Sequence, residues 1–227
     1  MWRILIKKFL VALIAKNPRL IEFNICTENN DISIENPKYG LKSLKKNINS
    51  LCSENKLKDF CINLSFYSES QAHNTCLNRK LCIDADGNIK NCPNMPQTYG
   101  NIKDTTLSQS IEKQGFKDCW YICKDKIDVC KDCEFRHICT DCRAFIKDPQ
   151  NIYSQPAKCG YNPYICLWQG QDGYVPVEEC GTYSKESGFV PDAEKIEKLN
   201  AEIWENNKLC IFQKNILPLR RKNYKNK

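Results

Sequence analysis

Four cysteines lie within the thirteen residues from Cys130 to Cys142, in the pattern C-x2-C-x5-C-x2-C. Two thiols three residues apart can reach one metal across a tight turn, where backbone N–H groups also point toward the sulfurs. Two such pairs within thirteen residues leave the segment little conformational freedom for a role other than binding metal. The segment therefore predicts a metal site, with a disulfide knot or inert buried thiols as the alternatives.

The cellular compartment decides between metal and disulfides for a chain of 227 residues with sixteen cysteines. The basic N-terminus contains a short apolar run over 9–15, which Lys16 closes, and it lacks a small-x-small cleavage site. No stretch reaches the ~18 apolar residues that a membrane span needs, so neither a signal peptide nor a membrane contact is predicted. We therefore expect a reducing cytoplasm, where such cysteines bind metal.

The formal net charge of +7 does not by itself predict a nucleic-acid partner. The lysines are spread along the chain, apart from a basic tail over 220–227. A nucleic-acid site would instead combine basic and aromatic residues on one face. The chain has only two histidines, His73 and His137, and so gives no support to a Ser-His-Asp triad.

The first seventy or so residues have the pattern of β/α units. The spacing of apolar residues predicts helices over 1–16 and 38–53, and strands over 19–26 and 58–67. This alternation indicates a parallel sheet. Two strands are too few for a closed barrel, so residues 1–72 are predicted to be the C-terminal remnant of a partial (β/α) barrel.

From residue 73 onward, cysteines, turns and short elements dominate. Residues 81–92 predict a β-hairpin around an Asp-Gly-Asn turn, and the calcium-loop alternative lacks its closing glutamate. Thr105 is expected to cap a helix that ends near Gly115, and a second helix is expected over 191–206. The predicted fold class is α+β, with a cysteine-rich domain over 73–165 and a C-terminal extension over 166–227.

Four further cysteines extend the central pattern. Cys76-x5-Cys82 and Gly87-x4-Cys92 precede it, and Cys159 follows it. This order resembles the SPASM domain, the C-terminal extension of radical SAM enzymes that modify peptides and proteins. The likeness covers residues 76–159. It departs from the family only before Cys142, where two residues stand in place of the usual three.

The resemblance implies two auxiliary [4Fe-4S] clusters, each bound by four thiolates. By position, the ligands of the first cluster are Cys76, Cys82, Cys92 and Cys142. The ligands of the second cluster are Cys130, Cys133, Cys139 and Cys159. The alternative is zinc in a structural module that only binds a partner, because C-x2-C-x5-C-x2-C alone suits zinc well. That alternative leaves the other four cysteines without a common purpose.

A closer likeness, carried by residues 133–136, 141–143 and 158–164, is to the SPASM proteins of grasp-with-spasm peptide-maturation systems. It implies that the chain is a peptide maturase component with two partners, an ATP-grasp peptide ligase and a ribosomally made precursor peptide. We expect the peptide to add a strand to the incomplete sheet or to the hairpin edge.

A radical SAM enzyme needs a C-x3-C-x2-C loop, and this sequence has none. The nearest stretch is Cys119-x3-Cys123, where Lys126 stands at the third position. S-adenosylmethionine binding is therefore not predicted for this chain, and whether it is itself an enzyme stays open. It is either the C-terminal part of a split protein or a natural variant without the SAM cluster.

Overall fold

The computed structural model describes residues 11–12, 15–16, 23–26, 41–44, 59–184 and 186–206. The chain separates into two compact units, Met1–Ser53 and Glu54–Lys227. The domain boundaries expected after residues 72 and 165 both fall within the second unit and stay predictions, as does the partial barrel.

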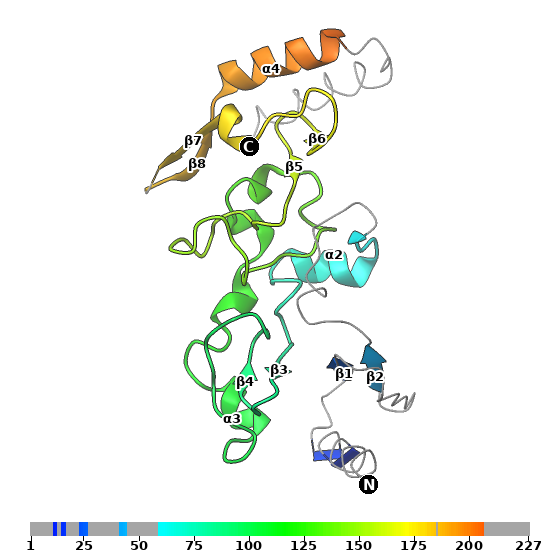
Figure 1. The fold of residues 1–227 in the computed structure, drawn as a ribbon, viewed down its shortest axis with the longest axis vertical. Coiled ribbons are helices and arrows are strands. Elements are labelled where there is room, and N and C mark those ends of the chain that lie inside the picture. The colour runs from blue at the N-terminus through cyan, green and yellow to red at the C-terminus, as the bar shows by residue number, and fades with distance from the viewer. Residues whose placement is uncertain are drawn as a thin grey trace. The chain divides into compact units, whose positions relative to one another are not determined.

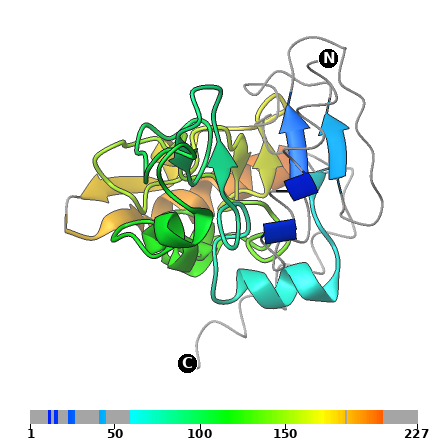
Figure 2. The same cartoon turned by 90° about the horizontal axis from the view of Figure 1, so that it is seen from below.

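The first unit contains a parallel strand pair. Strand β1 (Phe23–Cys26) pairs with β2 (Leu41–Leu44), and Figure 2 shows both strands pointing the same way. Strand β1 confirms residues 23–26 of the strand predicted over 19–26, and residues 11–12 and 15–16 are helical as predicted over 1–16. The other residues of these two ranges lie outside the described residues. The helix predicted over 38–53 is wrong at residues 41–44, because pairing with the distant β1 draws them into a strand. The rest of that range lies outside the described residues.

The second unit has helix α2 (Leu64–Ser70) where a strand was predicted over 58–67. Asn63 gives the physical reason, because its side-chain oxygen accepts a hydrogen bond of 2.8 Å from the Phe66 N–H and so caps the first turn. The apolar residues that suggested a strand are not buried on a sheet face. Ile62 is 82% exposed and Leu64 is 81% exposed.

Three short antiparallel hairpins lie in the described part of the second unit (Figure 1). Strands β3 (Cys82–Ile83) and β4 (Ile89–Lys90) confirm the hairpin predicted over 81–92. Gly87 occupies the turn with a φ of 86°, a conformation that suits glycine. The other pairs are β5 (Tyr161–Asn162) with β6 (Leu167–Trp168), and β7 (Gly181–Ser184) with β8 (Gly188–Pro191).

Two helices of this unit begin at side-chain caps. Helix α3 (Leu107–Ile111) has a capping box between Thr106 and Gln109, one residue beyond the cap predicted at Thr105. Helix α4 (Ala193–Asn206) confirms the helix predicted over 191–206, and the Asp192 carboxylate accepts hydrogen bonds from its first turn. The 3₁₀ helices are η4 (Asp118–Tyr121), η5 (Lys124–Lys126), η6 (Cys130–Asp132) and η7 (Val177–Cys180).

The hydrophobic core around α4 extends into the cysteine-rich region at Val129. Its buried members are Val129, Ile165, Leu167, Val177, Cys180, Phe189 and Ile203. Val129 has a φ of 66°, a costly conformation for a β-branched residue, and this core surrounds it. On the same side, Gly188 approaches Asp128 so closely that a Cβ atom there would clash with the carboxylate. The C-terminal region thus supports the chain immediately before Cys130.

Candidate metal centre

The segment from Cys130 to Cys139 is a succession of tight turns. It starts in η6, where the Cys133 N–H donates to the Cys130 carbonyl at 3.0 Å. The Cys139 N–H donates to the Phe135 carbonyl, also at 3.0 Å. These local hydrogen bonds fold the chain back on itself, so that thiols several residues apart can face a common space.

That space is a cavity lined by Cys130, Cys133, Cys139 and Cys159. They are the four residues predicted to bind the second cluster. Among the described residues, no three His, Cys, Asp or Glu side chains come together as a site for a single metal ion. A four-iron cluster distributes its four thiolates around a larger body than one ion. The four thiols are the kind of donor set that such a group requires.

The thiols of this cavity influence one another electrostatically. Burial raises the pKa of Cys130 to about 12, with Lys124 opposing the shift and Cys159 and Cys139 adding to it. Burial likewise raises the pKa of Cys139, where Lys124 again opposes and Cys159 adds. Burial therefore disfavours the thiolate form of both residues, and a bound metal would displace the proton of each thiol.

Lys124 is a cavity residue that the sequence analysis missed. It is buried, and its ammonium Nζ donates to the Cys139 sulfur at 3.1 Å. Burial alone would lower the pKa of Lys124, but its electrostatic interactions with Cys130, Cys139 and Asp141 and its hydrogen bond to Cys139 raise it overall. The chain has 34 lysines and arginines, and no local pattern distinguishes this one.

Four aromatic rings form a closed circuit of contacts on the cavity wall. Ring centroids lie 5.0 Å apart for Phe60–Phe135, 5.1 Å for Phe135–Tyr161, 4.8 Å for Tyr161–Trp168 and 6.2 Å for Trp168–Phe60. All four rings line the cavity. They give it an apolar wall, which limits the access of water to the thiols.

Two tyrosines join the segment after Cys159 to the residues on either side of Cys133. The Tyr161 hydroxyl donates to the Glu134 carboxylate at 2.6 Å, and the Tyr164 hydroxyl donates to the Asp132 carboxylate at 2.7 Å. The contact between Tyr161 and Glu134 connects two of the stretches that carry the closer family likeness. Both contacts also explain how Cys159, distant in sequence, comes to line the same cavity as Cys133.

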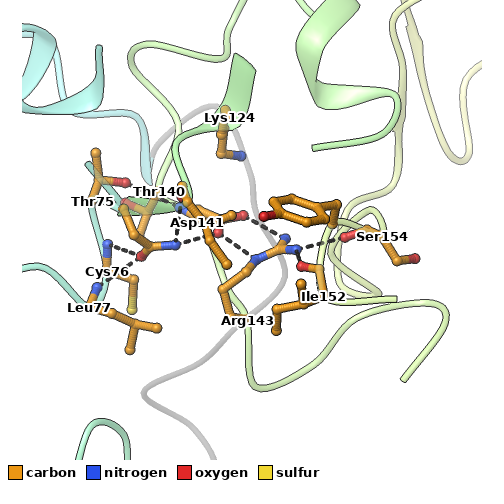
Figure 3. Close-up of polar contacts among 12 residues, drawn as sticks. Thr75, Cys76, Leu77, Lys124, Thr140, Asp141, Arg143, Ile152 and Ser154 are labelled. Carbon is orange, nitrogen blue, oxygen red and sulfur yellow. Dashed lines mark hydrogen bonds and ion pairs between the residues drawn. The ribbon is translucent and has the colours of Figure 1, made fainter. Parts of the chain in front are cut away.

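A buried ion pair flanks Cys142. Asp141 and Arg143 form a bidentate pair, with 2.6 Å from Nε to Oδ2 and 2.8 Å from Nη2 to Oδ1 (Figure 3). Their side chains are 1% and 0% exposed. The same guanidinium donates to the carbonyls of Ile152 and Ser154 at 2.7 and 2.8 Å. The backbone on both sides of Cys142 is therefore firmly held.

This ion pair also ties the chain to the segment of Cys76. The Asn74 side chain donates to Asp141 Oδ2 at 2.6 Å and accepts from the Cys76 N–H at 2.9 Å. The Asp141 N–H donates to Thr75 Oγ1 at 3.2 Å. Cys76 directly follows Thr75, and Cys142 directly follows Asp141, so this contact brings the two cysteine segments together.

The remaining ligands predicted for the first cluster lie on the two arms of the β3–β4 hairpin. Cys82 stands opposite Lys90, and Cys92 follows Lys90 by two residues. We call the four cysteines predicted for the first cluster the first set, and the four predicted for the second cluster the second set. In the first set, the structure brings together the segments of Cys76 and Cys142, and those of Cys82 and Cys92. In the second set, all four residues line one cavity.

Comparisons with protein-family models, curated proteins and solved structures give no match to this chain. The SPASM resemblance therefore remains a prediction from the cysteine pattern. None of the helices in the described ranges is both long and apolar enough to cross a membrane.

Proposed function

We propose that this chain is a SPASM-type component of a peptide-maturation system and binds two auxiliary [4Fe-4S] clusters. The observation that carries the proposal is the cavity lined by Cys130, Cys133, Cys139 and Cys159. These four thiols come from two segments, brought together by the contacts of Tyr161 and Tyr164. The resemblance to the SPASM domain assigns the same four cysteines to one cluster.

The chain's own residues would hold and tune the clusters. When bound, a [4Fe-4S] cluster accepts and donates single electrons, at a potential set by charge, hydrogen bonds to sulfur and solvent exposure. Lys124 supplies positive charge and a hydrogen bond to sulfur. Phe60, Phe135, Tyr161 and Trp168 supply the apolar wall. We assign no S-adenosylmethionine chemistry to the chain, because its sequence lacks the C-x3-C-x2-C loop.

Metal analysis of anaerobically purified protein tests this proposal. We expect a brown protein with broad visible absorption and about eight irons per chain, four for each cluster. Treatment with an iron chelator should bleach the absorption together with the loss of iron. A colourless protein that contains zinc and no iron would contradict the proposal and support the structural zinc module.

We also propose that the chain acts with an ATP-grasp peptide ligase on a ribosomally made precursor peptide in the cytoplasm. The β3–β4 hairpin offers such a peptide one edge rather than two. The outer edge of β4 is already paired at Ile89. The Ile89 N–H donates to the Gly100 carbonyl at 2.8 Å, and the Ile89 carbonyl accepts from the Tyr99 N–H at 2.7 Å. An added strand on this hairpin would therefore pair with β3.

Binding of a candidate precursor peptide should depend on its leader segment. An added strand gains affinity from main-chain hydrogen bonds, and these are lost when the segment that supplies them is deleted. Calorimetry or fluorescence anisotropy with full-length and leaderless peptides measures the difference. Equal affinity of the two peptides would exclude recognition through the leader.

A further inference from the structure

Lys124 places a buried ammonium beside the thiols of the second set, where an unpaired charge is strongly unfavourable. Among the described residues, Cys139 Sγ is the one acceptor that Lys124 Nζ reaches within hydrogen-bond distance. A neutral thiol is a weak acceptor, whereas a thiolate forms a charge-assisted hydrogen bond. The hydrogen bond from Lys124 is therefore strongest when Cys139 is a thiolate, which is the form in which a cysteine binds metal.

The cations near the first set are placed differently. Arg143 is neutralised by its bidentate pair with Asp141, and Lys90 forms an ion pair of 3.2 Å with Asp84. Lys80 donates to a backbone carbonyl and is exposed, so that solvent screens its charge. Lys124 thus differs from these cations in being both buried and bonded directly to a sulfur.

We propose that Lys124 raises the reduction potential of the cluster bound by Cys130, Cys133, Cys139 and Cys159, so that this cluster is reduced before the first. The inference rests on the proposed function, because it requires both clusters. Reduction takes one electron from an external reductant and makes the cluster more negative by one charge. A fixed cation in a medium of low dielectric constant favours that state, as does a hydrogen bond to a ligand sulfur.

The test is an anaerobic potentiometric titration with dithionite, followed by electron paramagnetic resonance, on the wild type and on Lys124→Met. We expect the equilibrium constant for reduction of the second cluster to fall at least about tenfold, or roughly 59 mV for a one-electron couple. Lys126→Met is the matched control, because Lys126 lies in the same η5 helix but is exposed. It should shift the constant less than about twofold, because solvent screens its charge.

A second measurement does not depend on the variant holding iron. Wild-type protein labelled with ¹⁵N at lysine Nζ should show a nitrogen hyperfine coupling at its first-reduced cluster, because Lys124 Nζ lies 3.1 Å from a ligand sulfur. The absence of that coupling, or an iron-loaded Lys124→Met with an unchanged potential, would overturn the inference alone. A wild type without iron would overturn the proposed function as well.

Discussion

Replacing Asp141 with asparagine should lower the free energy of unfolding by about 3–5 kcal/mol, the range for breaking a buried ion pair. The substitution keeps the shape of the side chain but removes the charge that neutralises Arg143. The Arg143 side chain is 0% exposed and cannot turn toward water without opening the fold. Urea denaturation of wild type and variant under the same metal-loading conditions measures the difference.

The ion pair of Arg136 with Asp125 is the matched control. Its Nε–Oδ1 distance of 2.7 Å is close to the 2.6 Å of the buried pair, but its side chains are 30% and 42% exposed. Asp125→Asn should therefore change the free energy of unfolding by less than about 1 kcal/mol. If Asp141→Asn were no more destabilising than Asp125→Asn, the buried pair would not hold this part of the chain together.

A compensating double variant separates the loss of charge balance from the loss of contacts. In Asp141→Leu with Arg143→Met neither member of the ion pair is left without its partner, and replacing a buried pair by apolar residues is often nearly neutral. Here recovery should be partial, because Asn74 and the carbonyls of Ile152 and Ser154 lose their partners. The double variant should be more stable than Asp141→Asn and less stable than the wild type.

The sequence was most informative where structure depends on near neighbours. The β3–β4 hairpin follows from alternating residues around Gly87, and helix α4 follows from its apolar spacing and from Asp192. Helix α2 was missed although its determinant is also local. The cap made by Asn63 outweighed a run of apolar residues that the structure leaves exposed.

Contacts between distant parts of the chain account for the other differences. Strand β2 forms by parallel pairing with β1, which helical spacing over 38–53 could not reveal. The resemblance to the SPASM domain grouped Cys159 with Cys130, Cys133 and Cys139, and these four line one cavity. Spacing could not indicate Lys124, because its role depends on where the chain crosses the cavity and not on its neighbours in sequence.

Replacing Cys133 and Cys142 one at a time should remove iron from different clusters. Cys133 lines the cavity of the second set, so Cys133→Ser should leave about four of about eight irons, all in the first cluster. Cys142→Ser should leave a similar number in the second cluster. Iron analysis and electron paramagnetic resonance of the reduced variants would show which signal each one loses. Cys61→Ser, outside both sets, should keep the full iron content.

This pair of variants decides whether residues 130–142 form one four-thiol site or a junction between two. Under the proposed assignment these residues form a junction, and Cys142 is not among the described residues that line the cavity. It lies between Asp141 and Arg143, where Asp141 contacts Thr75 and Asn74 beside Cys76. If both variants lost the same signal, the four thiols of C-x2-C-x5-C-x2-C would share one metal. The closeness of Cys142 to Cys139 in sequence would then outweigh the contacts of Asp141 with Thr75 and Asn74.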